Sequence, residues 1–191
     1  MPRTFVFNTL FNTRLSTGGF EYGGVARWTK RLKVDIRRHD LILVPVTLGN
    51  SHWVLSGVDM EQRKFICLES MRAPDSNNVV GNLRKRMRYE LKGKHGADAA
   101  EQLVVAGWYT MFHKYYVRCN FKVAGHLGAS SGAIGRMAHI PEQTDGESCG
   151  VFAVMIADCL ALSMKVFFTQ ADMATVRARM AIDIFCEQLS T

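Results

Sequence analysis

The apolar residues of this chain fall into runs whose lengths predict three consecutive strands in its first half. Leu41–Leu48 is a nearly continuous apolar run, as expected for a strand that is buried on both faces. Trp53–Val58 and Lys64–Leu68 are shorter, and the polar stretch Asp59–Arg63 between them suits a hairpin turn. The pattern therefore predicts a buried strand followed by a β-hairpin.

Three later segments have the spacing of helices. Asn82–Lys92 is amphipathic, and its basic face is either a solvated outer surface or a docking surface for an acidic partner. Cys149–Met164 is apolar nearly all round, which is typical of a buried central helix. Asp172–Leu189 has Asp172 as its N-cap and an apolar stripe that we expect to pack in the core. The residues that define these faces are Leu83, Met87 and Leu91 (apolar) and Arg84, Lys85, Arg86 and Arg88 (basic) in the first helix, and Met173, Val176, Met180 and Ile184 in the last.

The order of these elements predicts an α+β fold. Strands come first, a helix follows, and Gly125–Gly135, which is rich in Gly, Ser and Ala, is expected to be a loop before the last helices. The 191 residues are enough for one domain with a sizeable core and too few to favour two.

Composition and charge narrow the class of protein. The formal charge of +7 favours an acidic partner, which could be nucleic acid, a membrane surface or an acidic protein. The 5 cysteines include no CxxC pair, which argues against a disulfide framework or a structural zinc site and favours a reducing compartment. The chain has no apolar run near the length of about eighteen residues that a membrane helix needs, and Met1–Leu15 does not have the pattern of a signal peptide.

Cys149 is the strongest candidate for a nucleophile. It lies where a polar turn containing Gly146 leads into the apolar helix that begins with Cys149 and Gly150. A helix N-terminus carries a partial positive charge and free amide groups, and both favour a thiolate. Cys159 and Cys186 lie in apolar helical stretches, and we expect them to be inert core residues.

His52 is the candidate base, because it opens a strand at the rim of the predicted sheet. If the hairpin turn is centred near Glu61, Trp53 lies opposite Glu69, and His52 lies beside Glu69 and Ser70. A slip of one residue would leave the two neighbours but could turn one of them to the other face. The hairpin thus supplies the orienting carboxylate that such a base requires.

Two further residues have a functional and a structural interpretation. Gln143, six residues before Cys149, could donate an N–H to a developing oxyanion together with the Cys149 amide, or it could be a surface loop residue. Trp53 is either a buried strand residue or the wall of a narrow peptide channel.

Together these residues resemble the SUMO-specific cysteine proteases of the ubiquitin-like-protease family. The resemblance covers nearly the whole chain, and its most specific parts are the His52–Trp53 pair and the block that joins Gln143 to Cys149–Gly150. The matching blocks are, in order, Phe7–Phe11, Arg27–Lys30, Asp40–Val46, Leu48–Trp53, Cys67–Met71, Ile140–Gln143, Gly146–Phe152, Ala157–Cys159, Phe168–Gln170 and Arg177–Met180.

The resemblance implies a papain-like α+β fold of the ubiquitin-like-protease type, with a mixed sheet packed on a central helix that begins at Cys149. It implies a triad of His52, Glu69 and Cys149, with Gln143 in the oxyanion hole and Trp53 over the Gly-Gly tail of the modifier. The implied reaction is hydrolysis, through a thioester, of the bond after that tail in conjugates or precursors. It implies a SUMO-type modifier and its conjugates as partners, nuclear or nucleocytoplasmic placement, and no metal, organic cofactor, nucleic acid or membrane; oligomeric state is left open.

Three departures from the family pattern affect these expectations. Glu69 stands where the family usually has Asp, although the related adenoviral proteases resemble this chain in using Glu. We expect residues 1–191 to be one catalytic domain that lacks the family's N-terminal segment. An insert near 115–137 is either a specificity loop beside the active site, a disordered insert or sequence from a mistaken gene model, and we favour one of the latter two.

Other functions compete with the protease. The departures are compatible with a non-catalytic remnant that binds a ubiquitin-like modifier, although all four site positions keep chemically competent residues. A protease for a different ubiquitin-like modifier would need the same chemistry. Nucleic-acid binding rests on the charge alone, because no RNA-binding signature or zinc-finger spacing supports it.

Overall fold

The computed structural model describes residues 1–49, 51–71, 78–105, 108–112, 115–116 and 138–186. Five strands form one mixed sheet in the order β1-β2-β3-β4-β5, and the edge pairs β1–β2 and β4–β5 are parallel whereas the inner pairs are antiparallel. The strands are β1 (Thr4–Val6), β2 (Leu41–Leu48), β3 (His52–Asp59), β4 (Lys64–Leu68) and β5 (Tyr109–Phe112), and a separate pair consists of β6 (Tyr115–Tyr116) and β7 (Ala138–His139).

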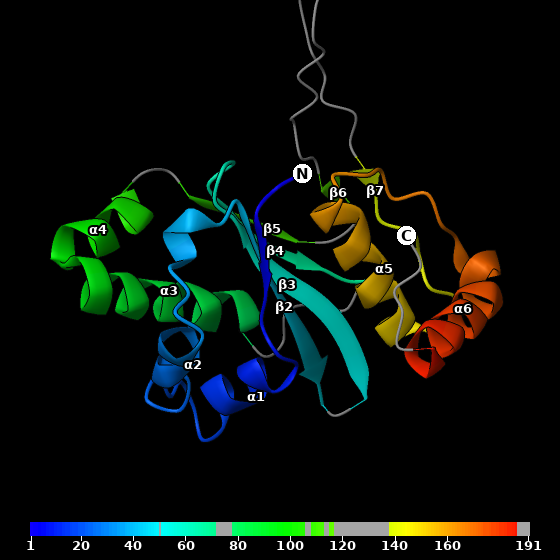
Figure 1. The fold of residues 1–191 in the computed structure, drawn as a ribbon, viewed down its shortest axis with the longest axis horizontal. Coiled ribbons are helices and arrows are strands. Elements are labelled where there is room, and N and C mark those ends of the chain that lie inside the picture. Colours follow the sequence, from blue (N-terminus) through cyan, green and yellow to red (C-terminus); the bar gives the residue numbers. More distant parts are fainter. Residues whose placement is uncertain (50, 72–77, 106–107, 113–114, 117–137, 187–191) are drawn as a thin grey trace, which may run out of the picture.

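Helices cover both faces of the sheet, as Figure 1 shows, with α1 to α4 on one side and α5 and α6 on the other. The arrangement confirms the expected α+β fold, with a mixed sheet packed on a helix that begins at Cys149. The helical elements are α1 (Leu10–Ser16), α2 (Ala26–Arg31), η1 (Ile36–Arg38), α3 (Val79–His95), α4 (Ala97–Val105), α5 (Cys149–Ala161), η2 (Gln170–Asp172) and α6 (Met173–Phe185).

The side chains of β2 alternate between two hydrophobic cores. Ile42, Val44 and Val46 pack with residues of α1 and α3, whereas Leu41 and Leu43 pack with residues of α5. Because β2 is covered on both faces, its sequence is apolar at almost every position. The structure therefore confirms the expected buried strand and places α5 against the same sheet.

The C-terminal segment confirms one expectation and corrects two. Asp172 is the N-cap residue of α6, as expected, but its carboxylate makes no capping hydrogen bond to the helix and instead accepts from the amide and hydroxyl of Thr169 (2.8 and 3.0 Å). The apolar stripe leaves the core along α6, since Ile184 is 78% exposed. Cys186 follows α6 and is exposed, whereas Cys159 is buried as expected. Burial raises the pKa of the Cys159 thiol, in keeping with an inert core residue.

The expected loop over Gly125–Gly135 and residues 117–137 of the expected insert lie outside the described residues. The described α3 is longer than the expected Asn82–Lys92 at both ends.

The basic face of α3 is not wholly solvated, because Arg86 is completely buried. Its guanidinium lies 3.0 Å from the carboxylate of Glu90, which is also completely buried. Lys94 approaches the same carboxylate at 2.6 Å, and the hydroxyl of Thr29 donates to it at 2.5 Å. The Arg86 guanidinium also lies over the ring of Phe7. This cluster fastens α2 and the N-terminal segment to α3.

We expect Glu90→Gln to lower the free energy of unfolding by roughly 3–5 kcal/mol near neutral pH, because it leaves the buried Arg86 without its counter-charge. Burial by itself would raise the pKa of Glu90, but Arg86, Lys94 and Thr29 outweigh it and hold the pKa below the ordinary value of 4.5. A carboxylate with a lowered folded pKa stabilises the fold above its ordinary pKa, and that contribution is lost as the pH falls through the folded value.

The deficit of the variant should therefore shrink as the pH falls below the ordinary value of 4.5, which urea unfolding at several pH values measures. Glu101→Gln is the matched control, since Glu101 is 63% exposed and its pair with Arg88 spans 3.8 Å. A deficit as small as the control's would contradict the assignment of Glu90 as the centre of this cluster.

Candidate active site

Cys149 begins α5 and lies at the rim of the sheet. The first regular helical hydrogen bond runs from the amide of Phe152 to the carbonyl of Ser148 at 2.9 Å. The amides of Cys149, Gly150 and the residue after them therefore precede the helical ladder and have no acceptor within the helix. This position leaves the Cys149 amide available to an oxyanion.

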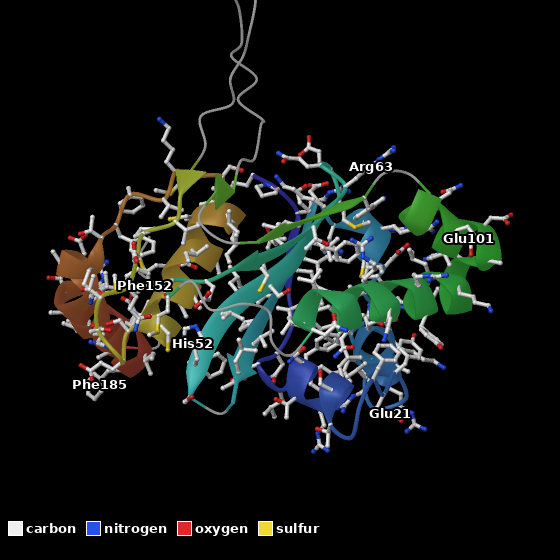
Figure 2. All side chains as sticks on the ribbon, turned by 180° about the vertical axis from the view of Figure 1, so that it is seen from behind. Glu21, His52, Arg63, Glu101, Phe152 and Phe185 are labelled. Atoms are coloured by element: carbon white, nitrogen blue, oxygen red, sulfur yellow. The ribbon has the colours of Figure 1, made fainter. Side chains whose placement is uncertain are left out.

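The segment Ser51–Trp53 contacts the start of α5 at two residues. The Cys149 thiol lies 3.9 Å from the carbonyl oxygen of Ser51. On the other side of His52, the indole of Trp53 packs against Gly150, where an added β-carbon would lie 3.4 Å from Trp53 Cδ1. Figure 2 shows His52 at the start of β3 beside α5. His52 is thus held between two residues that each contact the start of the helix.

His52 pairs with Glu69 as expected. The distance between His52 Nε2 and Glu69 Oε1 is 2.9 Å, and the same oxygen accepts the amide N–H of Met71 at 3.1 Å. Glu69 is only 5% exposed. Because Nε2 is engaged with the carboxylate, Nδ1 is the ring nitrogen left to exchange a proton with a thiol.

The register that makes this pair differs by one residue from our expectation. β3 and β4 pair with Leu55 opposite Leu68, whereas we expected Trp53 opposite Glu69. Continued to the end of the strands, the observed register places Glu69 on the same face as His52, two positions along. The expected register would have turned their side chains to opposite faces. The expected register was wrong, although the pair it was used to predict does form.

A tighter turn causes this shift. The strands close with Asp59 opposite Lys64, so only four residues form the loop. The Asp59 carboxylate accepts the amide N–H of Gln62 at 2.9 Å, and Arg63 adopts a left-handed conformation with φ of 53°. An aspartate that caps its own turn is a local signal, but the left-handed residue is an arginine, which sequence rules do not expect there.

Gln143 belongs to the hydrogen-bond network of the loop that precedes Cys149. It is 6% exposed, its backbone N–H donates to the carbonyl of Ser70 at 3.0 Å, and its side-chain oxygen accepts from the Ser70 hydroxyl at 2.8 Å. Its side-chain nitrogen donates to the carbonyl and the carboxylate of Asp145, at 2.7 and 3.0 Å. The structure therefore places Gln143 beside the end of β4, and its role in an oxyanion hole stays a prediction.

Sequence reasoning missed the residues that support the loop before Cys149. Asp145, Ser148, Gln170 and Arg177 are joined there by hydrogen bonds. The spacing Asp-x-x-Ser in 145–148 is a local turn signal that could have identified the first two. Gln170 and Arg177 come from η2 and α6, and no local pattern connects them to the loop.

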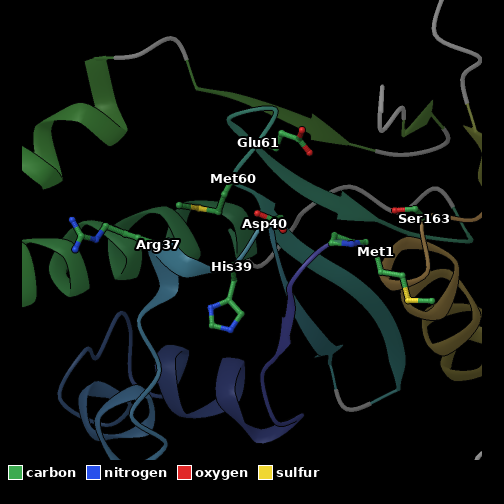
Figure 3. Close-up of a pocket in the computed structure, with 8 residues that line it drawn as sticks. Met1, Arg37, His39, Asp40, Met60, Glu61 and Ser163 are labelled. Carbon is green, nitrogen blue, oxygen red and sulfur yellow. The ribbon is translucent and has the colours of Figure 1, made fainter. Parts of the chain in front are cut away.

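A cavity of about 550 Å³ lies at the other end of the sheet and is not part of this site. Figure 3 shows it around the N-terminal methionine. Met60 lines it just after β3 ends, whereas His52 begins β3. The residues that line the cavity are Met1, Pro2, Arg37, His39, Asp40, Met60, Glu61 and Ser163.

The described part of the chain contains neither a metal-binding cluster nor a membrane-spanning helix. Among those residues, no group of three or more His, Cys, Asp or Glu side chains is arranged to hold a metal ion. Likewise, no described helix combines the length and the apolar character needed to cross a membrane.

Comparison with known proteins places the whole chain in one family. The sequence profile of the Ulp1 protease family, C-terminal catalytic domain, matches residues 1–190. The chain is 31% identical over 188 residues to a sentrin-specific protease of Caenorhabditis elegans. The matched region makes up 98% of this chain and 22% of that protein. It is 32% identical over 181 residues to sentrin-specific protease 5 of Homo sapiens, and this match makes up 95% of this chain and 19% of that protein.

The fold agrees with a solved structure of the same family. The catalytic domain of the Chaetomium thermophilum Ulp1-like SUMO protease superposes on this chain with a TM-score of 0.71 at 25% identity, covering 100% of this chain and 63% of that one. The chain spans about a fifth of the length of the two curated relatives, 22% and 19%. The resemblance noted from its motifs is confirmed: this chain belongs to the Ulp1 protease family and corresponds to its C-terminal catalytic domain.

Proposed function

We propose that this chain is a cysteine protease that hydrolyses the bond after the C-terminal Gly-Gly of a SUMO-type modifier. The pair of His52 and Glu69, 2.9 Å apart and flanked by residues that contact the start of the Cys149 helix, carries the proposal. Family membership and the solved SUMO protease of the same fold support the substrate class.

The reaction follows from the three side chains. The Cys149 thiolate attacks the carbonyl carbon of the terminal glycine, and the C–N bond to the target lysine breaks while protonated His52 gives its proton to the departing amine. Water then attacks the thioester while neutral His52 accepts one of its protons, and the C–S bond breaks to expel the Cys149 thiolate. This step restores the thiolate and protonated His52 and releases the modifier as a carboxylic acid, which loses its proton to the solvent. Glu69 orients the imidazole and stabilises its charged form.

Charge that develops on the glycine carbonyl oxygen needs donors at a fixed position. The Cys149 amide is one, because it precedes the ladder of α5. We propose Gln143 as the second, although its side-chain nitrogen must turn one N–H from Asp145 toward the oxyanion. The short contacts of Gln143 with Ser70 keep the amide group beside the site while it does so.

Trp53 suits a narrow channel for a tail without side chains. The indole already packs on Gly150, which has no β-carbon, so the space above the start of α5 is limited. A Gly-Gly segment can pass through such a space more easily than any other dipeptide. Nuclear or nucleocytoplasmic placement stays a prediction that rests on the family resemblance alone.

The first test is covalent labelling with a SUMO C-terminal electrophile, either a vinyl sulfone or a propargyl amide. We expect an adduct on the wild-type chain and none on Cys149→Ser, because only the thiolate at residue 149 can attack the probe. A ubiquitin probe of the same chemistry is the specificity control, and Cys186→Ser, which removes the one cysteine that is exposed in the described part of the chain, should label like the wild type.

The outcomes separate the competing functions. Labelling by the ubiquitin probe alone would replace the modifier but keep the chemistry. Absence of any adduct, from protein whose circular dichroism shows that it is folded, would refute the protease and favour a modifier-binding remnant.

A second prediction concerns Glu69. Glu69→Gln should lower kcat on a fluorogenic SUMO C-terminal amide by roughly 100-fold or more, because an amide donates to the imidazole as readily as it accepts and no longer fixes its tautomer. Glu69→Asp should lose less, since it keeps the charge and shortens the reach by one methylene. Full kcat in Glu69→Gln would exclude Glu69 from the triad.

A further inference from the structure

One carboxylate, that of Asp145, accepts five hydrogen bonds at the loop before Cys149. Its Oδ1 accepts the amide N–H groups of Ser148 and Glu147 at 2.8 and 3.1 Å, and the side-chain N–H of Gln143 at 3.0 Å. Its Oδ2 accepts the hydroxyl of Ser148 and the side-chain N–H of Gln170. The Ser148 hydroxyl first, with the two amides and Gln143, holds the pKa of Asp145 well below its usual range.

The C-terminal segment holds the same loop from outside. Gln170 donates to the Asp145 carboxylate at 2.7 Å, and its own oxygen accepts the amide N–H of Thr144 at 2.9 Å. Arg177 of α6 donates to the carbonyl of Glu147 at 2.9 Å and to the Ser148 hydroxyl at 3.0 Å. The loop is therefore anchored by η2 and α6 as well as by its own side chains.

Asp145 connects the two donors that the reaction needs. Through Gln143 it holds the side-chain amide, and through the amide of Ser148 it fixes the residue directly before Cys149. A shift of about 1 Å between such groups costs catalysis steeply, because oxyanion donors act only at the position where charge develops. The modifier and its tail, in contrast, would still bind to the rest of the domain.

We infer that Asp145 is a positioning residue for the proposed protease reaction, and that Gln170 holds its carboxylate so that Gln143 and the start of α5 stay aligned. This inference rests on the proposed function. It predicts an effect on kcat with little effect on KM, and it predicts that the effect depends on the hydrogen-bond pattern between residues 145 and 170.

The test is a swap of donor and acceptor. Asp145→Ala removes every side-chain acceptor and should lower kcat on the SUMO amide by roughly 100-fold, the cost of one lost oxyanion donor. Asp145→Asn should lose less, because its oxygen can still accept from Gln143 and from the amides, but its NH2 group meets the NH2 of Gln170. Gln170→Glu alone places two carboxylates in contact and should also lower kcat.

The double variant Asp145→Asn with Gln170→Glu restores the pair with its polarity reversed. The new side-chain amide at position 145 then donates to the new carboxylate at position 170, which can still accept from the Thr144 amide. We expect its kcat to return to within a few-fold of the wild type, a coupling that independent single losses would not produce. Asp183→Ala is the matched control. Asp183 also lies on α6, but it pairs with Arg179 of the same helix, at a distance of 3.3 Å, and not with the loop.

Wild-type kcat in Asp145→Ala, a loss confined to KM, or no recovery in the double variant would overturn the inference. Amide hydrogen exchange gives a readout that does not depend on the modifier. The amides of Glu147 and Ser148 should exchange faster in Asp145→Ala and recover in the double variant, and unchanged exchange would overturn the inference. If the wild type cleaves no SUMO substrate, the proposed function fails, and exchange alone decides whether Asp145 positions the loop.

Discussion

The register of the β3–β4 hairpin is the constraint on which the rest of the site depends. Since side chains alternate along a strand, His52 and Glu69 meet only if the two strands pair so that both point to one face. The four-residue turn, closed by Asp59 opposite Lys64, sets that register. The 2.9 Å contact between His52 and Glu69 is a consequence of how the chain turns at the far end of β3. A turn one residue longer would leave both residues at the sheet rim but turn their side chains to opposite faces.

A second constraint brings the nucleophile to the same rim. Helix α5 is apolar nearly all round, so its stable position is against the sheet, where Phe152 and Ile156 pack on residues of β2 to β4. The polar turn before it cannot enter this core, and Cys149 therefore lies at the boundary. Gly150 allows the indole of Trp53 to lie against the first turn, and this contact draws the start of β3 and the start of α5 together.

Features encoded in one segment could be predicted from the sequence, and features that join distant segments could not. The bounds of Lys64–Leu68 and the start of α5 at Cys149 followed from apolar runs and from the turn before the helix. The burial of Arg86 did not, because its basic neighbours suggested a solvated face. Its counter-charge Glu90 lies one turn away on the same helix, but Thr29 and Phe7, which complete the cluster, are distant in the chain. The predicted register of the hairpin was wrong for a local reason. The turn contains Arg63 in a left-handed conformation, and the sequence gives no signal for that conformation.

The polar network of the loop before Cys149 joins residues that are distant in the sequence. Ser70 at the end of β4 holds Gln143, Gln143 holds Asp145, and Asp145 is held in turn by Gln170. Each of these groups is partly or fully shielded from water. Leaving one of them without a partner would therefore destabilise the protein by more than the loss of a hydrogen bond between neutral groups at the surface. The network is therefore most stable in the arrangement that satisfies all its members, which also fixes the distance from the sheet to the start of α5. Because the hairpin already fixes His52 and Glu69 to the sheet, this chain of contacts adds to the packing of α5 and to the contact of Trp53 with Gly150 in holding base and nucleophile in one common frame.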